Sequence, residues 1–393
     1  MRDVVIVAAA RTPFGRFGGA FRDLTAADLG AIALREVVRR AGLHGPEIDQ
    51  VILGNCMGAA SLGQVPARQA ALKAGLPESV PVFSLEQACT AALLATRLGY
   101  QLIRHGEAQI VVSGGMESMS QVPYVLPGAR FGYRLGNSQV IDALVSALTC
   151  PITGVHMGVY AGRGAAEHGI ARQDQDRWAL RSHQRYFAAK EAGKFTTEIV
   201  PVEVAGRKGT VTVVDSDEQP RADTSLEKLA RLPVVFEGAG TVTAGNAPGL
   251  NDGATALVMM PAEESVRRGL EPLARIVAVG QAAAAPAQIA VVPALAAQDA
   301  LQRAGLPPAD IDLWEINEAF AAVTLVSIKV LGIDPELVNV NGGSVAIGHP
   351  VGATGARILM ALIYELRRRA GKYGLATICG AGAHGQAMIV EAT

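Results

Sequence analysis

The chain has 393 residues, of which 50% are hydrophobic and 18% charged, so it is long enough for two or three compact domains or two fused copies of one domain. The 35 Lys and Arg residues nearly balance the 36 Asp and Glu residues, and the net charge of −1 argues against a nucleic-acid or membrane-surface partner. Four scattered cysteines, none in a CxxC pair, exclude a disulfide scaffold and favour reduced thiols in a cytoplasmic protein.

The first expected element is a strand over residues 4–10, whose continuous apolar run is typical of a strand buried on both faces. This run lacks the length and the cleavage site of a signal peptide, and no stretch approaches the roughly 20 apolar residues that span a bilayer. A helix is expected over residues 26–41, with Thr25 as its N-cap and Gly42 at its end. A strand over 48–54 and a helix over 61–74 follow.

Residues 89–104 are apolar on nearly all sides, which predicts a helix buried at the centre of the protein with Cys89 in its first turn. A buried strand over 108–113 comes next. Part of this order recurs later, because Ala-Gly-Leu at 41–43 with Glu-Ile-Asp at 47–49 is echoed by Ala-Gly-Leu at 304–306 with Asp-Ile-Asp at 310–312. The repeat predicts an α/β fold built from two repeated α/β/α halves.

The domain boundaries follow from this repeat. Residues 1–119 together with about 250–271 are expected to form the N-terminal half, and residues 272–393 the C-terminal half. The segment between them, residues 120–249, mixes loop-like, charged and Gly-rich stretches. We expect an inserted loop domain there that covers the active site and shapes specificity.

Three short stretches near the C-terminus carry residue types suited to acyl chemistry. Asn317 lies in Asn-Glu-Ala-Phe-Ala, His349 lies in Gly-His-Pro, and Cys379 precedes Gly-Ala-Gly-Ala. A thiolate supplies a nucleophile or base, an imidazole moves a proton, and an amide holds an oxyanion or a water. Cys89 is a second such cysteine far upstream, and its expected place at a helix N-terminus would lower its thiol pKa.

Each of these residues also has a purely structural interpretation. Cys89 and Cys379 are also typical of buried core cysteines, and Asn317 is typical of a helix N-cap. His384 is either a partner of Cys379 or a turn residue, and the turn is favoured. The constrained loop around His349 favours function. A metal site is not expected, because the His and Cys residues lack ligand spacing, and no glycine-rich stretch forms a Walker A pattern.

Taken together, the motifs resemble the thiolase family, in particular its short-chain, biosynthetic acetyl-CoA acetyltransferases. The matching stretches run nearly end to end and lie at 9–15, 114–120, 156–158, 240–247, 251–254, 317–321 and 339–357. The resemblance implies a thiolase-like fold and an acyl-CoA C-acyltransferase of fatty acid metabolism, assembled as a homodimer or homotetramer. It also implies coenzyme A thioesters as substrates and no permanently bound cofactor.

The resemblance further implies a two-stage mechanism through an acyl-enzyme intermediate. His349 would take the proton of Cys89, whose thiolate attacks an acyl-CoA thioester. Cys379 would then abstract an α-proton from a second acetyl-CoA, and the enolate attacks the acyl group in a reversible Claisen condensation. Asn317, with His349 and a water, would stabilise the enolate oxygen. Backbone N–H groups of Cys89 and near Ala381 would form a second oxyanion hole.

Residues along the path of coenzyme A are likewise implied by the resemblance. Arg221 would stack on adenine. The full set is Leu148, His156, Met157, Arg221, Ala244, Pro248, Ala319 and Phe320.

The sequence departs from the family pattern around the acyl pocket. Glu86 stands for a usual Asn, Ala91 and Ala92 for Ser-Gly, and Pro248 for a Ser, while the turn after Cys379 differs as well. Glu86 is expected to raise the pKa of a nearby thiol. These changes keep two alternatives open, a divergent acyltransferase or thioesterase that forms no carbon–carbon bond and a non-catalytic CoA-binding protein. Acyl-chain length, direction, and dimer versus tetramer are left open too.

Overall fold

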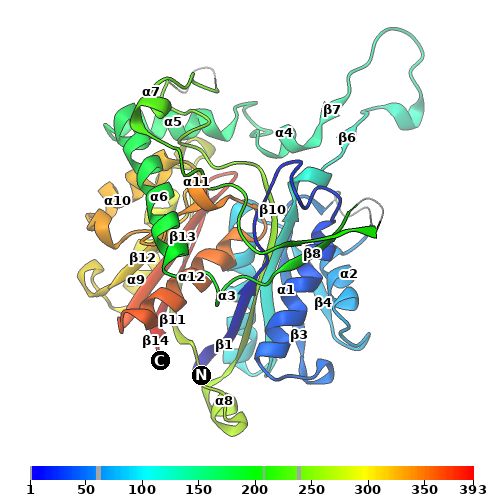
Figure 1. Ribbon diagram of the computed structural model, residues 1–393, viewed down its shortest axis with the longest axis vertical. Coiled ribbons are helices and arrows are strands. Elements are labelled where there is room, and N and C mark those ends of the chain that lie inside the picture. Colours follow the sequence, from blue (N-terminus) through cyan, green and yellow to red (C-terminus); the bar gives the residue numbers. More distant parts are fainter. Residues whose placement is uncertain (1, 59–62, 207–208, 237–239) are drawn as a thin grey trace.

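The computed structural model of the chain describes residues 2–58, 63–206, 209–236 and 240–393. A ten-stranded sheet runs through the molecule in the order β12-β13-β14-β11-β1-β10-β5-β3-β4, with β2 paired to β10 (Figure 1). The bounds of its strands are β1 Val4–Arg11, β2 Gly15–Arg16, β3 Gln50–Gly54, β4 Val82–Leu85, β5 Val111–Ser118, β10 Asn251–Pro261, β11 Ala274–Ala283, β12 Leu313–Ile316, β13 Tyr373–Gly380 and β14 His384–Ala392.

The strand order repeats in the two halves of the chain, as the sequence repeat predicts. In the first half β1 pairs antiparallel with β10, β10 antiparallel with β5, and β5 parallel with β3. The second half repeats this pattern: β11 pairs antiparallel with β14, β14 antiparallel with β13, and β13 parallel with β12. The two half-sheets meet where β1 pairs with β11, through Val5 with Arg275 and Ile6 with Ala274.

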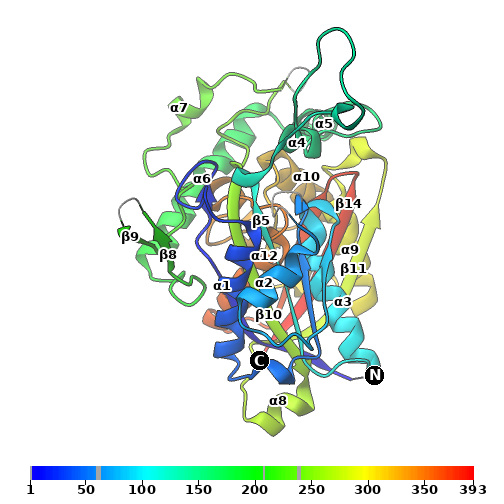
Figure 2. The ribbon, with the colours of Figure 1, turned by 90° about the vertical axis from the view of Figure 1, so that its right-hand side faces the viewer.

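Helices cover both half-sheets and also separate them, which gives alternating α, β, α, β, α layers from left to right in Figure 1. Figure 2 looks onto these layers from the outer helices of the first half. The middle layer holds α3 (Ala91–His105) and α12 (Thr354–Arg368), which share one buried core with strands of both halves. The outer layers hold α1 (Ala26–Arg40) and α2 (Pro66–Lys73) on the first half, and α9 (Val292–Ala304) and α10 (Ala321–Leu331) on the second. The predicted central helix is therefore real.

Local signals account for the helix ends, with two corrections. Thr25 and Asp28 form a capping box at the start of α1, a cap typically worth about 1 kcal/mol, as its sequence predicts. The helix expected over 61–74 begins only at Pro66, and residues 61 and 62 lie outside the described part of the chain. The central helix begins at Ala91 rather than at Cys89, which lies in a preceding 3-10 turn, η3 (Ala88–Thr90).

The segment between the halves lies partly beyond the upper end of the sheet in Figure 1 and partly along its side, where Val200, Val202, Val204 and Val214 pack on the core of the first half. Its β6–β7 hairpin projects from the body of the molecule at the upper right of Figure 1. No helix in the described ranges is long and apolar enough to cross a membrane. The remaining strands and helices are β6 Tyr124–Val125, β7 Ile141–Asp142, α4 Ala143–Ala147, α5 Met157–Glu167, α6 Arg172–Glu191, β8 Val202–Ala205, β9 Val211–Val214, α7 Leu226–Ala230, α8 Ala262–Arg268 and α11 Ser344–Ile347. Short 3-10 turns are η1 Gly45–Glu47, η4 Met119–Gln121, η5 Ala129–Phe131, η7 Pro286–Gln288, η8 Pro308–Asp310 and η9 Pro335–Leu337.

Candidate active site

One cavity of about 560 Å³ brings together the three groups on which the sequence interpretation depends. Cys89, His349 and Cys379 all line it, although 260 residues separate the first from the second. Most of the other predicted contact residues line it as well, namely Leu148, His156, Met157, Ala244, Pro248, Ala319, Phe320 and Ala381. Two predicted residues, Asn317 and Arg221, are not part of its lining.

Cys89 is presented to the cavity by a strained turn between β4 and α3. Ala88 has φ +48, an unfavourable left-handed conformation for a residue with a side chain, typically costing about 1–3 kcal/mol. The carboxylate of Glu86 stabilises the turn, because its Oε1 accepts the N–H of Ala88 at 2.8 Å. Thr90 fixes the other side by donating its hydroxyl to Gln87 O at 2.6 Å. Cys89 itself is partly exposed, toward the cavity.

The thiol of Cys89 is not acidified by its place before a helix, contrary to the sequence expectation. Burial raises its pKa to about 12, and the negative charges of Glu117 and Glu86 act in the same direction. The predicted effect of Glu86 is therefore confirmed in sign. Burial likewise raises the pKa of Cys379, and the charge of the Cys89 thiolate raises it further. Desolvation of a thiolate in this apolar cavity outweighs the partial charge of a helix end.

His349 lies on the loop that follows α11, and neighbouring elements hold this loop firmly. Its backbone N–H donates to Asn251 Oδ1 at 2.8 Å. Gly348 precedes it with φ +112, and a Cβ there would lie 2.7 Å from the Asn251 side chain, so only glycine fits. Glu318, buried, accepts the N–H of Val345 at 2.9 Å and hydrogen bonds from Trp178, Ser182 and Asn339.

The tautomer of His349 follows from one hydroxyl group. Thr354 donates its single hydroxyl hydrogen to Pro350 O at 2.8 Å, so its oxygen accepts from His349 Nδ1 at 2.8 Å. The Nε2 atom then carries a lone pair, and it is buried without a hydrogen-bond partner in the described structure. Burial, with the charge of Arg357 adding, lowers the pKa of His349 to about 3. The resting imidazole is neutral and ready to accept a proton.

Asn317 follows β12 and is fully buried, two residues before Ala319, which lines the cavity. Its backbone continues the pairing with β13, because its N–H donates to Thr377 O at 3.0 Å. Its side chain does not cap α10, which begins at Ala321 without a side-chain cap, so the N-cap interpretation is wrong.

Cys379 is fully buried in β13, one residue before the turn that enters β14. His384 lies at the start of β14 opposite Gly380, and it is not among the residues that line the cavity. The turn itself comprises residues 381–383, so His384 is the first residue of the strand and not the turn residue that the sequence interpretation favoured.

The outer part of the cavity is built from aromatic and apolar side chains. His156 stacks on Phe236 with ring centroids 4.1 Å apart, and its Nδ1 accepts the N–H of Gly158 at 3.0 Å. Phe236 meets Phe320 edge to face at 6.4 Å. Arg221 is elsewhere, with its backbone N–H donated to His183 Nδ1 at 3.2 Å. Its Nε and Nη2 atoms have no partner in the described residues.

Cys56 and Glu117 are among the site residues that the sequence interpretation missed. Cys56 lines the cavity as a third thiol, and its Sγ donates to Ala88 O at 2.8 Å. Glu117 is a fully buried carboxylate that accepts backbone N–H groups of Cys56, Met57 and Gly352. It joins the wall beside Cys89 to the loop that follows His349. Glu117 lies in the motif at 114–120, which was visible in the sequence. The motif does not show which backbone N–H groups the Glu117 carboxylate accepts.

The departures from the family pattern are not equivalent in space. Ala91 and Ala92 are fully buried and do not line the cavity. A Cβ at Gly54 would lie 2.7 Å from the backbone nitrogen of Ala92, so small residues are needed for close packing. Glu86 and Pro248, in contrast, both line the cavity. Of these four residues, only Glu86 and Pro248 can touch a substrate in the cavity.

Comparison with known proteins places this architecture in context. Residues 4–263 match the family model described as thiolase, N-terminal domain, and residues 270–392 match thiolase, C-terminal domain. The chain is 48% identical over 393 residues to an acetyl-CoA acetyltransferase of Escherichia coli (strain K12), covering 100% of this chain and 99% of the relative. An acetyl-CoA acetyltransferase of Cupriavidus necator is 46% identical over 392 residues, with 100% of both chains covered. The crystal structure of the Bacillus anthracis acetyl-CoA acetyltransferase superposes with a TM-score of 0.97 at 42% identity, covering 100% of this chain and 99% of that one.

Proposed function

The chain belongs to the thiolase family, and from this premise we propose that it is an acyl-CoA C-acyltransferase acting on acetyl-CoA. It condenses two acetyl-CoA molecules reversibly, or cleaves a 3-oxoacyl-CoA with coenzyme A in the opposite direction. The observation that carries the proposal is the convergence of Cys89, Cys379 and the unpartnered Nε2 of His349 on one cavity.

The first stage acylates Cys89. His349 Nε2 accepts the thiol proton as the Cys89 sulfur attacks the thioester carbonyl, so that no free thiolate has to persist in the apolar site. The backbone N–H groups of Cys89 and Ala381 stabilise the oxyanion of the tetrahedral intermediate. The carbon–sulfur bond to coenzyme A then breaks. The leaving thiolate takes the proton of Cys379, which leaves Cys379 as the base for the next stage.

The second stage forms the carbon–carbon bond. Cys379 removes a proton from the α-carbon of a second acetyl-CoA. The resulting enolate oxygen is stabilised by a hydrogen bond from Nε2 of the protonated His349 and by the Asn317 side chain. The enolate attacks the acyl carbon and expels the Cys89 sulfur, which recovers its proton from His349. All three groups return to their starting protonation states.

The second thiol is what separates this proposal from its rivals. A thioesterase or an acyltransferase that makes no carbon–carbon bond needs only one nucleophile with its base. A CoA-binding protein needs neither. Cys379, lying in the same cavity as Cys89, supports a reaction with a carbon acid, because only that reaction uses a second base.

The outer cavity suits the pantetheine arm of the substrate, because its lining is largely apolar with His156 as a polar group. Arg221 is proposed to meet the adenine end beyond the cavity, which agrees with its two unpartnered guanidinium nitrogens. No resident cofactor is required, and the four free cysteines support a reducing, cytoplasmic location.

A homodimer or homotetramer is supported by apolar surface left uncovered in the single chain. β4 lies at the end of the strand order and exposes Phe83. The projecting hairpin exposes Phe131 at 88% and Leu135 at 98%, values unusual for large apolar side chains.

The decisive experiment is mass spectrometry of the intact protein after exposure to a panel of acyl-CoAs, with the adduct mapped to its cysteine. An acyl group on Cys89 is expected, and the tolerated acyl length is read from the same data. An adduct on Cys56 or Cys379 alone, or none at all, would overturn the assignment of the nucleophile.

A further inference from the structure

The two ends of the Asn317 side chain are in different environments. Its Oδ1 accepts a hydrogen bond from the Ser344 hydroxyl at 2.7 Å. Its Nδ2 is buried and has no partner in the described residues. A buried donor without a partner typically costs about 1–3 kcal/mol. The Nδ2 donor is therefore available for a further hydrogen bond.

The Ser344 hydroxyl can only be the donor in its hydrogen bond with Asn317. Arg357 Nη2 donates to Ser344 Oγ at 3.0 Å, and a guanidinium has no acceptor, so the serine oxygen must accept there. The one hydroxyl hydrogen of Ser344 is then directed at Asn317. If the amide were turned over, its NH₂ group would face Ser344, and both the serine hydrogen and the amide oxygen would lose these partners.

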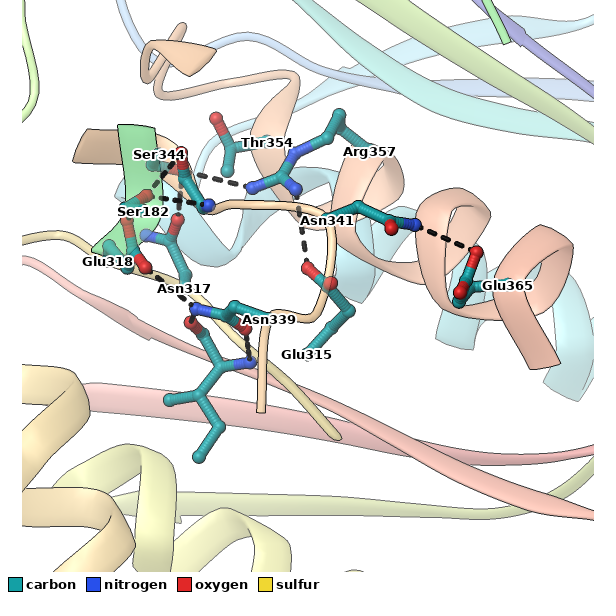
Figure 3. Close-up of polar contacts among 12 residues, drawn as sticks. Ser182, Glu315, Asn317, Glu318, Asn339, Asn341, Ser344, Thr354, Arg357 and Glu365 are labelled. Atoms are coloured by element: carbon teal, nitrogen blue, oxygen red, sulfur yellow. Dashed lines mark hydrogen bonds and ion pairs between the residues drawn. The ribbon is translucent and has the colours of Figure 1, made fainter. Parts of the chain in front are cut away.

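The serine is held by a buried ion pair. Arg357 Nη1 lies 3.3 Å from Glu315 Oε2, and the two side chains are 1% and 6% exposed. Figure 3 shows Asn317 turned toward Ser344, with Arg357 reaching from α12 to both Ser344 and Glu315. The contacts connect β12, α11 and α12, so the orientation of the Asn317 amide depends on three elements of the C-terminal half.

We propose that Glu315, Arg357 and Ser344 form a relay that fixes the Asn317 amide with its oxygen toward Ser344, so that its Nδ2 donor stays available for the enolate stage. The proposal rests on the function proposed above and refines it. Ser344 and Arg357 are positioning residues, because they act through Asn317. The relay serves the enolate stage, since the acylation of Cys89 uses other groups.

The first test is Ser344→Ala, which removes the hydroxyl and leaves the amide free to turn. The condensation kcat, and the exchange of acetyl-CoA methyl protons in D₂O, are expected to fall about 10- to 100-fold. Acylation of Cys89, followed by mass spectrometry, is expected to keep its rate. Ser327→Ala is the matched control, because Ser327 is also fully buried but bonds only Val323 O within its own helix. Ser344→Cys replaces the hydroxyl with a slightly larger group that is a weaker donor, and its kcat should lie between those of Ser344→Ala and the wild type.

A double-mutant comparison separates the relay from a general structural role. In an Asn317→Ala background, Ser344→Ala should cause no further loss of kcat, because the group it positions is gone. A further loss as large as that in the wild-type background would overturn the relay, and so would an unchanged kcat in Ser344→Ala itself. A wild-type protein that is never acylated on Cys89 would instead overturn the proposed function, and the relay with it.

Discussion

Glu318 offers a sharp test of how the catalytic loop is held. Its carboxylate accepts hydrogen bonds from Trp178 Nε1, Ser182 Oγ, Asn339 Nδ2 and the N–H of Val345, at 2.8 to 3.1 Å. Glu318→Ala removes four buried hydrogen bonds, each worth about 1–3 kcal/mol. Because Ser182 and Asn339 keep second acceptors, Gly343 O and Ile316 O, the total is expected near the lower limit of about 4 kcal/mol. Unfolding entropy of about 2.1 cal/mol/K per residue over 393 residues converts this into a melting temperature lower by about 5 °C.

The assay is thermal unfolding together with kcat for acetoacetyl-CoA thiolysis. Because Val345 lies in the short helix leading to His349, kcat is expected to fall with stability. Glu336→Ala is the control, since this carboxylate is 72% exposed and its ion pairs with Arg181 and Arg185 are worth little. A Glu318→Ala protein that melts within about 1 °C of the wild type would refute this account of the four donors.

Three further predictions address the site itself. Cys89→Ser should abolish the acyl adduct, because a hydroxyl is a far weaker nucleophile beside an imidazole whose pKa is lowered to about 3. Cys56→Ser is the control and should keep the adduct. Persistence of the adduct in Cys89→Ser would point to another thiol as the nucleophile. Cys379→Ala should still be acylated by acetyl-CoA, although more slowly because the leaving coenzyme A thiolate loses its proton donor, while condensation falls about 10²- to 10⁴-fold. Complete absence of the acyl-enzyme would contradict the role of Cys379 as the second base. Burial raises the pKa of Glu117 from 4.5 to about 7, so its neutral form is favoured in the folded protein, and stability present below about pH 4.5 is lost as the pH rises toward 7. The loss approaches about 3 kcal/mol, so Glu117→Gln should gain in melting temperature relative to the wild type between pH 5 and 8, and a pH-independent difference would contradict the assignment.

Much of the fold was predictable because its signals are local. The capping box at Thr25 and Asp28, the all-round apolar helix after Cys89 and the echo of Ala-Gly-Leu all lie within short windows, and the structure confirms what they indicate. The start of α3 was misplaced by two residues, because a carboxylate two positions away stabilises a strained turn at Ala88. Residue type alone does not reveal that strain.

The electrostatics of the site were less accessible. A helix N-terminus argued for an acidic Cys89 thiol, yet burial raises its pKa to about 12. The outcome depends on how completely the apolar cavity excludes water, which is a property of many chain segments at once. The free Nδ2 of Asn317 is equally invisible in sequence, because Ser344 and Arg357 are 27 and 40 positions away from it.

The sequence by itself determined the repeated α/β architecture and the identity of the two cysteines, the histidine and the asparagine, since these follow from local periodicity and from motifs. Only the tertiary structure decided which of them share a cavity, which nitrogen of His349 is free, and that Cys56 and Glu117 lie beside the nucleophile. The physical reason is that protonation, hydrogen-bond direction and solvent exclusion depend on distances between side chains, and folding sets those distances through contacts among residues far apart in the chain.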